Sequence, residues 1–364
     1  MSLKGGEKPQ WSFRLDQAIY GSFVKTTRLD NIVYNAFSNT SIAAATELNV
    51  FIDIYSVIHS LFSEHYRIEY VNYTDITSCL INMCAHYRSY FRRLQVNTTF
   101  FLVFSTNCCE INRKFVSSYN ELFLNKTRVP ESKKIVNDNL RLLTALCPYL
   151  PDIHFINSTE SFESSVIIAN LIETLNDGKP NLIISRDIYP IQLSYLYPNT
   201  TYLYPRKKKN IGDVSVLIPV FEKPTFRDEF WSLITDIRGI KGEALRKLSP
   251  VNYSLVCAMT YFSDRNIKGL YNVSQAAKLI SSIVGNEDIK IDISQLNRPE
   301  ITSQFNVPLI EARYNTIDVP FMMPYYRNTP ECKNIKLLNL RDDAVINQIN
   351  AKYFTNNPID LMKL

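Results

Sequence analysis

Four short apolar segments in the first half of the chain constrain its fold most strongly. They are LNVFIDI (48–54), TTFFLVFS (98–105), DIHFIN (152–157) and NLIIS (181–185). Their lengths and their many β-branched and aromatic residues are typical of buried strands, and longer stretches with helical spacing separate them. A shorter fifth strand is expected at TYLY (201–204). Strands that alternate with helices predict an α/β fold with a doubly wound, mostly parallel sheet over 48–205.

The segments between these strands show the apolar spacing of amphipathic helices. In residues 75–94 the apolar side chains recur on one face, whereas Arg88 and the adjacent pair Arg92 and Arg93 fall mostly on the other side. We interpret the pair as a surface feature. A second helix is expected over 133–150, before the third strand. Consecutive strands are therefore linked by helical connections, as a parallel sheet requires.

The remainder of the chain divides into three further parts. Residues 1–47 mix short apolar and polar pieces and are interpreted as an N-terminal extension. Residues 206–294 begin with the cluster RKKK and are expected to be mainly helical, and residues 295–364 form a proline-punctuated tail with a last helix near 342–353. The sequence has no uninterrupted apolar run of about 18 residues and no apolar signal-peptide core, so we expect neither a transmembrane helix nor secretion.

Composition narrows the classes of protein to which the chain can belong. Of its 364 residues 46% are hydrophobic and 21% are charged, which suits a packed globular protein. The formal net charge of +5 is a mild basic excess that permits a polyanionic partner without requiring one. The seven cysteines form no CxxC pair and the four histidines are scattered. We therefore expect reduced thiols in a cytoplasmic setting and no zinc site.

Acidic residues follow two of the predicted strands at the point where each strand ends. Asp53 lies near the end of the first strand, and Asp187 lies just past the fourth, in LIISRDIYPIQL. The carboxyl ends of parallel strands meet at one edge of the sheet, where α/β proteins bind their ligands. A lone carboxylate does little chemistry there, but several in one cleft bind divalent metal ions. The structural alternative is that each acid caps the helix or turn that follows it.

The order of these pieces resembles the flap endonuclease and 5′–3′ exonuclease family, whose nuclease domain is a PIN-like α/β sheet. The family's first strand ends in an Asp, as FIDI does at Asp53. The family's EADDVIATL is similar to ESSVIIANL in this chain, which keeps Glu163. Its SGDKDLLQL is similar to SRDIYPIQL, which keeps Asp187. The resemblance covers about residues 48–285 and implies a nuclease fold.

Most of the metal-binding acids of that family are replaced in this sequence. The positions where the family has acids hold Ser105, Ser165, Val166, Tyr189 and Phe262. Arg186 and Arg265 add positive charge nearby, and Asp264 is displaced by one position from a family Asp. The family's two-metal phosphodiester hydrolysis needs several carboxylates around two ions, so no catalytic residue is assigned and we lean against an enzyme. The resemblance leaves a remnant acidic site formed by Asp53, Glu163, Asp187 and Asp264.

The remaining acids limit the number of metal ions that the site could bind. Asp53, Glu163 and Asp187 could together hold a single Mg²⁺ or Mn²⁺ ion, which binds oxygen ligands. In the alternative arrangement Arg186 pairs with one of these carboxylates and satisfies it, and no metal binds. A second ion would have almost no ligands left.

The resemblance also implies a nucleic-acid-binding surface. The family has a basic arch after its second strand and a helix-hairpin-helix element later, and the matching parts of this sequence are 108–134 and 260–280. The candidate contacts are Arg113, Lys114, Lys126, Arg128, Arg206, Lys207, Lys208, Lys209, Asn266, Lys268 and Gly269. They would bind the phosphate backbone of DNA or RNA without reading its sequence, and such binding is sensitive to salt. The alternative is that these charges belong to solvated loops and turns.

Three functions remain open. The first, which we favour, is a catalytically degenerate family member that binds nucleic acid or serves as a scaffold in a nucleoprotein assembly. The second is an active metal-dependent 5′ nuclease with a rearranged site, in which Glu160 or Asp264 replaces missing ligands. The third is a virion structural or assembly protein whose N-terminal extension and aromatic tail, VPFMMPYYRNTP, bind a protein partner. The same tail could instead be a strap packed on the core.

Composition also bears on the source of the chain. Its richness in Asn, Ile and Tyr is typical of an AT-rich genome, such as that of a phage or another virus. We therefore expect the protein in a host cytoplasm or in a virion. No membrane partner is expected.

Overall fold

The computed structural model of the protein describes ten stretches of the chain, namely 45–54, 73–105, 130–158, 162–185, 187–205, 214–217, 226–238, 243–260, 270–285 and 287–353. Within them one six-stranded sheet is formed by β1 (Glu47–Asp53), β2 (Asn97–Ser105), β3 (Ile153–Ser158), β4 (Asn181–Ile184), β5 (Thr200–Pro205) and β6 (Val214–Leu217). The strand order is β3-β2-β1-β4-β5-β6, in which the first five strands are parallel and β6 is antiparallel to β5. This confirms the predicted α/β fold with a mostly parallel sheet, to which β6 is an unpredicted addition.

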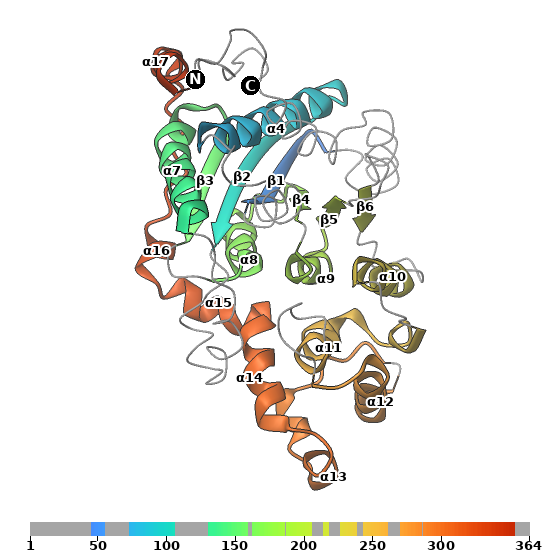
Figure 1. Cartoon of the computed structure of the whole chain (residues 1–364). Helices are drawn as coiled ribbons and strands as arrows, with labels where there is room; N and C mark the ends of the chain where they lie inside the picture. Colours follow the sequence, from blue (N-terminus) through green and yellow to red (C-terminus); the bar gives the residue numbers. More distant parts are fainter. Residues whose placement is uncertain are drawn as a thin grey trace, which may run out of the picture.

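Helices cover both faces of this sheet (Figure 1). Those of the described stretches are α4 (Tyr73–Arg93), α7 (Pro130–Leu146), α8 (Ser164–Leu175), α9 (Leu193–Leu196), α10 (Phe226–Arg238), α11 (Tyr253–Met259), α12 (Val273–Val284), α13 (Pro299–Thr302), α14 (Val307–Ile317), α15 (Val319–Arg327), α16 (Pro330–Lys333) and α17 (Asp343–Tyr353). α4 and α7 pack together on one face, and α8 packs against β2 on the other. In this described part, no helix combines the length and the apolar character that crossing a membrane requires.

The side chains of each strand alternate between two hydrophobic cores. Phe51 and Phe101 belong to the core on the α8 side, where their rings stack with centroids 4.9 Å apart. Ile52 and Leu102, the next residues along the same strands, belong to the core under α4 and α7. Each such side chain contributes about 1.5–3 kcal/mol when it is fully buried. Burial on both faces explains why the strands read as continuous apolar runs.

Arg88 lies in the interior, which corrects the prediction that it falls on the polar side of its helix. The residue is 3% exposed, whereas Arg92 and Arg93 are exposed as predicted. Its Nη2 donates hydrogen bonds of 3.4, 2.7 and 3.3 Å to the carbonyl oxygens of Thr98, Pro151 and Asp152. These carbonyls lie where β2 and β3 begin and need donors, a requirement that the helical spacing alone does not reveal.

The C-terminal tail packs along the domain as a strap. α15 lies against α8, and its residues Met322 and Tyr326 are buried in the core on that side. Further along, the Leu340 N–H donates a 2.7 Å hydrogen bond to the Pro148 carbonyl, and Ile346 of α17 is buried in the opposite core. The tail therefore passes β3, the edge strand, on its way to α17 (Figure 1). Of the two alternatives for VPFMMPYYRNTP (319–330), the structure shows the strap packed on the core.

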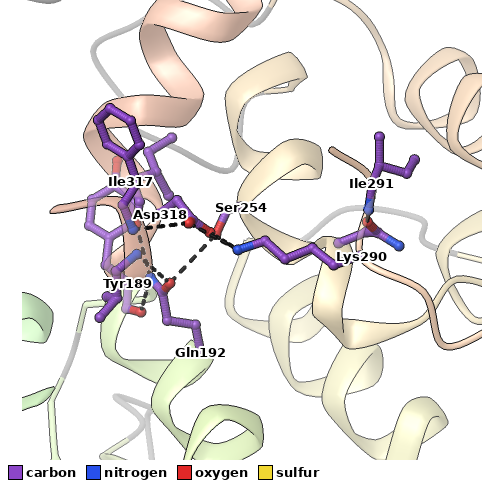
Figure 2. A network of polar contacts seen from close by, with 10 residues as sticks. Tyr189, Gln192, Ser254, Lys290, Ile291, Ile317 and Asp318 are labelled. Atoms are coloured by element: carbon purple, nitrogen blue, oxygen red, sulfur yellow. Dashed lines mark hydrogen bonds and ion pairs between the residues drawn. The ribbon is translucent and has the colours of Figure 1, made fainter. Parts of the chain in front are cut away.

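Gln192 ties this tail to the rest of the domain (Figure 2). It ends the 3₁₀ helix η4 (Tyr189–Gln192), and its buried Nε2 donates to the carbonyls of Tyr189 at 3.0 Å and Ile317 at 3.1 Å. Its Oε1 accepts hydrogen bonds from the Val319 N–H at 3.1 Å and from Ser254 Oγ at 3.5 Å. One side chain thus links η4, α11 and the junction between α14 and α15.

The free cysteines of the described residues behave as core residues. Cys84, Cys147 and Cys257 are buried, and Cys332 is partly exposed. Burial raises the pKa of the Cys84 thiol to about 12 and also raises that of Cys147. These two thiols are therefore protonated at neutral pH, when a thiol is a small apolar group rather than a nucleophile.

Candidate functional site

Four polar side chains meet at the carboxyl edge of the sheet, on the face that α8 covers. They end four adjacent parallel strands: Ser158 (β3), Ser105 (β2), Asp53 (β1) and Ser185, which follows β4. Each lies two positions after a side chain of the core on the α8 side, namely Ile156, Val103, Phe51 and Ile183. Because the side chains of a strand alternate between faces, all four point to that side. None of them is more than 2% exposed.

Asp53 and Ser185 flank the topological switch point of the sheet, between β1 and β4. The crevice outside this point is where open α/β sheets bind their ligands. In this protein Ser185 Oγ donates a 2.7 Å hydrogen bond to Asp53 Oδ2. Asp53 therefore lies at the edge of the sheet, and its carboxylate accepts a hydrogen bond from a neutral hydroxyl of the neighbouring strand.

The Asp187 carboxylate accepts hydrogen bonds within the turn that follows β4. Its Oδ1 accepts a 2.6 Å hydrogen bond from the Ile188 N–H and a 3.4 Å one from the Tyr189 N–H. Its own N–H donates to Ser185 Oγ at 2.9 Å. A carboxylate that accepts backbone N–H groups in this way orders a turn. The structural alternative, in which Asp187 supports the turn, matches these contacts.

Glu163 occupies the N-cap position of α8 with an extended backbone and makes no side-chain cap hydrogen bond. Its carbonyl accepts the Val166 N–H at 3.0 Å. A carboxylate is favoured at this end of a helix by the helix dipole alone. Val166, which stands where the family has an acid, is 1% exposed and fills the core on the α8 side. That position therefore supplies packing rather than a ligand.

Among the described residues, the side chains at this edge do not provide the ligands of a two-metal centre. Mg²⁺ binds carboxylate oxygens and water in octahedral geometry, whereas Ser105 and Ser158 offer neutral hydroxyls. Across the residues that the structure describes, no three or more His, Cys, Asp and Glu side chains gather in a way that could hold a metal ion. The alternative of one ion on the remnant acids stays a prediction.

The predicted nucleic-acid contacts lie outside the described residues. This applies to Arg113, Lys114, Lys126, Arg128, Arg206, Lys207, Lys208, Lys209, Asn266, Lys268 and Gly269, and equally to Glu160, Arg186, Phe262, Asp264 and Arg265. Of the predicted element at 260–280, residues 261–269 lie outside the described residues, whereas α12 covers most of its second half and packs against α11, which ends just before it. The roles of these residues therefore remain predictions.

Ser158 and Ser185 belong to the edge but were not among the predicted site residues. Each lies two positions beyond a core residue of its strand, as Asp53 does on β1. This shared spacing could have identified both serines from the sequence, because it places the three side chains on one face of the sheet. Serine is not a typical metal ligand, so a search of the sequence for acidic residues does not select it.

Comparison with known proteins gives matches at the level of structure alone. No family model and no curated protein sequence matches the chain. It is similar to a bacteriophage T5 flap endonuclease pseudo-enzyme–product complex with DNA and metal ions, at 13% identity and a TM-score of 0.48 over 87% of this chain and 98% of that chain. It is also similar to the T5 5′-exonuclease with bound zinc, at 13% identity and a TM-score of 0.45 over 76% of this chain and 91% of that chain.

A third similar structure is the catalytic core of Rad2 in complex with a DNA substrate, at 12% identity and a TM-score of 0.40 over 88% of this chain and 93% of that chain. The two T5 structures are of a flap endonuclease and a 5′-exonuclease. TM-scores below 0.5 at such identities describe a partial likeness of the chain trace, and they say nothing about activity.

Proposed function

We propose that this protein is a catalytically degenerate relative of the flap endonucleases that binds nucleic acid without cleaving it. The observation that carries the proposal is the hydrogen bond from Ser185 to Asp53 at the switch point of the sheet. It engages the Asp53 carboxylate with a neutral side chain at the position where the sequence resemblance implies a metal ligand. The turn contacts of Asp187 support the same conclusion, because they give a second remnant acid a structural task.

The residues that replace the family's acids support the loss of catalysis. Ser105 ends β2 and Val166 fills the core, and neither a hydroxyl nor an alkyl group neutralises a divalent ion. A metal ion contributes several kcal/mol of transition-state stabilisation to phosphodiester hydrolysis, and each ~1.4 kcal/mol is a factor of ten in rate. A site with at most one ion would therefore be slower by several powers of ten.

The nucleic-acid side of the proposal rests on the sequence. The net charge of +5 and the basic segments 113–128 and 206–209 suit contacts to phosphates. Such contacts fix a nucleic acid in place without reading its bases. The protein would then act as a binding or scaffold component of a nucleoprotein assembly, in a phage or another virus.

One experiment separates binding from catalysis. Purified full-length protein is titrated with Mg²⁺ and Mn²⁺ while its melting temperature is followed, and a 5′-flap DNA is incubated in the same tubes. Fluorescence anisotropy of the same DNA is measured at low and high salt. We expect binding that weakens steeply with salt and no cleavage. Multiple-turnover cleavage with either metal would overturn the proposal.

An Asp53→Asn variant is the matched control. If Asp53 has no metal to bind, the variant and the natural protein respond identically to both metals. If the edge holds a working ion, the variant loses the metal-induced rise in melting temperature together with any cleavage.

The second candidate function is an active metal-dependent 5′ nuclease with a rearranged site. One observation favours it: Asp53 and Glu163 keep their places at the carboxyl edge and at the N-terminus of α8. It predicts that metal raises the melting temperature, that flap DNA is cleaved, and that Asp53→Asn abolishes both effects.

A further inference from the structure

Two serine hydroxyls at the carboxyl edge of the sheet are buried without a hydrogen-bond partner in the described part of the chain. Ser158, which ends β3, is 0% exposed, and Ser165, in the first turn of α8, is 1% exposed. Burying a hydroxyl without a partner is unfavourable. In native proteins such a group therefore calls for an explanation, such as a water or an ion bound beside it.

The neighbouring strand supplies a third hydroxyl. Ser158 is in register with Ser105 of β2, and adjacent strands lie about 4.8 Å apart. Both side chains point to the face on which α8 packs against β2, because Val103 and Ile156, two positions earlier, belong to the core on that side. The two strand-end hydroxyls are thus side by side beneath the helix that carries Ser165.

The first turn of α8 adds backbone donors to these hydroxyls. α8 is 12 residues long, and the N–H groups of Val166 and Ile167 both point to the Glu163 carbonyl. Among the described residues, the N–H groups of Ser164 and Ser165 have no such partner. The aligned peptide dipoles place partial positive charge at this end of the helix. Hydroxyl and amide donors at a helix N-terminus are a suitable environment for an anion.

We propose that Ser105, Ser158 and Ser165, together with the first turn of α8, bind a phosphate group. The group is either free inorganic phosphate or the terminal phosphate of a nucleic acid, since both present the same tetrahedral set of acceptor oxygens. The inference rests on the proposed function, because a phosphate occupies this edge directly only where divalent ions do not. The edge has then changed from binding cations through carboxylates to binding an anion through hydroxyls.

Replacing Asp53 is expected to have opposite effects on phosphate binding and on metal binding. Asp53 lies on β1, next to the strand that carries Ser105, and its Oδ2 is engaged by Ser185 on the opposite side. A nearby negative charge repels phosphate, so replacing Asp53 by Asn tightens phosphate binding. At a metal site the same replacement has the opposite effect, because it removes a ligand.

The test is a calorimetric titration of inorganic phosphate into the metal-free full-length protein, with sodium chloride of equal ionic strength as the blank. Ser158→Ala and Ser165→Ala are each expected to weaken phosphate binding about tenfold, the loss of one hydrogen bond to a charged group. Thr98→Val is the matched control. Thr98 is another buried hydroxyl without a partner among the described residues, but it lies at the opposite end of β2, so its loss leaves phosphate binding unchanged.

The outcomes are separable. Binding that Ser158→Ala and Ser165→Ala weaken, and that Asp53→Asn tightens, supports the inference. Competition by a 5′-phosphorylated oligonucleotide, but not by its 5′-hydroxyl counterpart, identifies the nucleic-acid terminus as the source of the phosphate. The inference is overturned if no phosphate binds, or if all four variants bind phosphate with the same affinity as the natural protein. Either result would mean that the two buried hydroxyls are hydrogen-bonded only by bound water.

Failure of this inference is distinct from failure of the proposed function. DNA binding without cleavage, combined with no effect of the serine variants, rejects the phosphate site alone. Metal-dependent cleavage of flap DNA rejects the proposed function whatever the phosphate titration gives. Because Ser→Ala removes a hydroxyl that has no partner, both serine variants are expected to fold, which circular dichroism verifies.

Discussion

Ser185 donates a 2.7 Å hydrogen bond to Asp53 across the two central strands of the sheet, β4 and β1. The two residues are 132 positions apart in the chain and are 0% and 2% exposed. The bond lies at the switch point, where a doubly wound sheet leaves a crevice for a ligand. It therefore joins the two halves of the sheet at the place where the sequence resemblance predicts a metal ligand.

Ser185→Ala is expected to destabilise the protein by about 1–3 kcal/mol, because it leaves the buried Asp53 carboxylate without this donor. Urea unfolding in phosphate-free buffer measures the change. Ser165→Ala is the control, since it is the same substitution at a buried hydroxyl that has no partner among the described residues. It should leave the free energy of unfolding unchanged or slightly raised. Equal losses in the two variants would mean that the Ser185–Asp53 bond contributes nothing specific.

Gln192→Leu is expected to destabilise the protein by about 2–4 kcal/mol, because the buried Ile317 carbonyl and Val319 N–H, and the partly buried Tyr189 carbonyl, lose their hydrogen bonds to Gln192. Gln304→Leu is the control. Gln304 also donates to a carbonyl of its own helical turn, but it is exposed, so its replacement should change stability by less than about 0.5 kcal/mol. Comparable effects of the two substitutions in urea unfolding would show that the tail is not held by Gln192.

The sheet was predictable from the sequence because its central strands are buried on both faces. Segments such as 98–105 carry apolar residues at nearly every position, and few other structures accommodate such a run. β6 (Val214–Leu217) was missed for the opposite reason. A run of four residues is too short for its periodicity to distinguish a strand from any other apolar run. The segment is a strand because it pairs with β5, which the local sequence does not reveal.

The candidate site was only partly predictable, because its contacts are between distant positions. The place of Asp53 at the end of a buried strand follows from local pattern. Its hydrogen bond to Ser185 depends on β1 lying next to β4, a neighbour relation that the spacing of apolar residues does not encode. Arg88 shows the same limit, since the carbonyls that it satisfies belong to strands that a helical projection of α4 does not include.

Arg88→Leu is expected to cost about 3 kcal/mol of stability, although it replaces a charge by an apolar group in the core. The Pro151 carbonyl loses the 2.7 Å hydrogen bond from Arg88, the Asp152 carbonyl keeps only the Phe100 N–H, and breaking a buried hydrogen-bond set is among the most costly substitutions. Arg92→Leu, on the exposed side of the same helix, should change stability by about 0.5 kcal/mol or less. Thermal and urea unfolding of both variants tests the contrast, and a cost for Arg92→Leu as large as for Arg88→Leu would contradict it.

His154 is expected to make the protein less stable in mild acid. Burial lowers the pKa of its imidazole in the folded protein, while the Asp152 carboxylate and a hydrogen bond with the Leu338 backbone partly oppose that shift. The unfolded chain keeps a pKa near 6.5, so it binds the proton first as the pH falls. The unfolded state is therefore favoured progressively below about pH 6.5, and this effect is absent above about pH 7.5.

The measurement is urea unfolding at about pH 7.5 and pH 5.5, on either side of the unfolded pKa of histidine, for the natural protein and for His154→Gln. The loss of stability between the two pH values should be smaller in the variant, because glutamine does not titrate. His154 lies on the edge strand β3, beside the strap that contains Leu338, so the protection of the amides of residues 336–342 against hydrogen exchange, relative to their intrinsic rate at each pH, should also fall at the lower pH in the natural protein. An identical pH dependence in both proteins would assign the loss to carboxylates elsewhere in the chain.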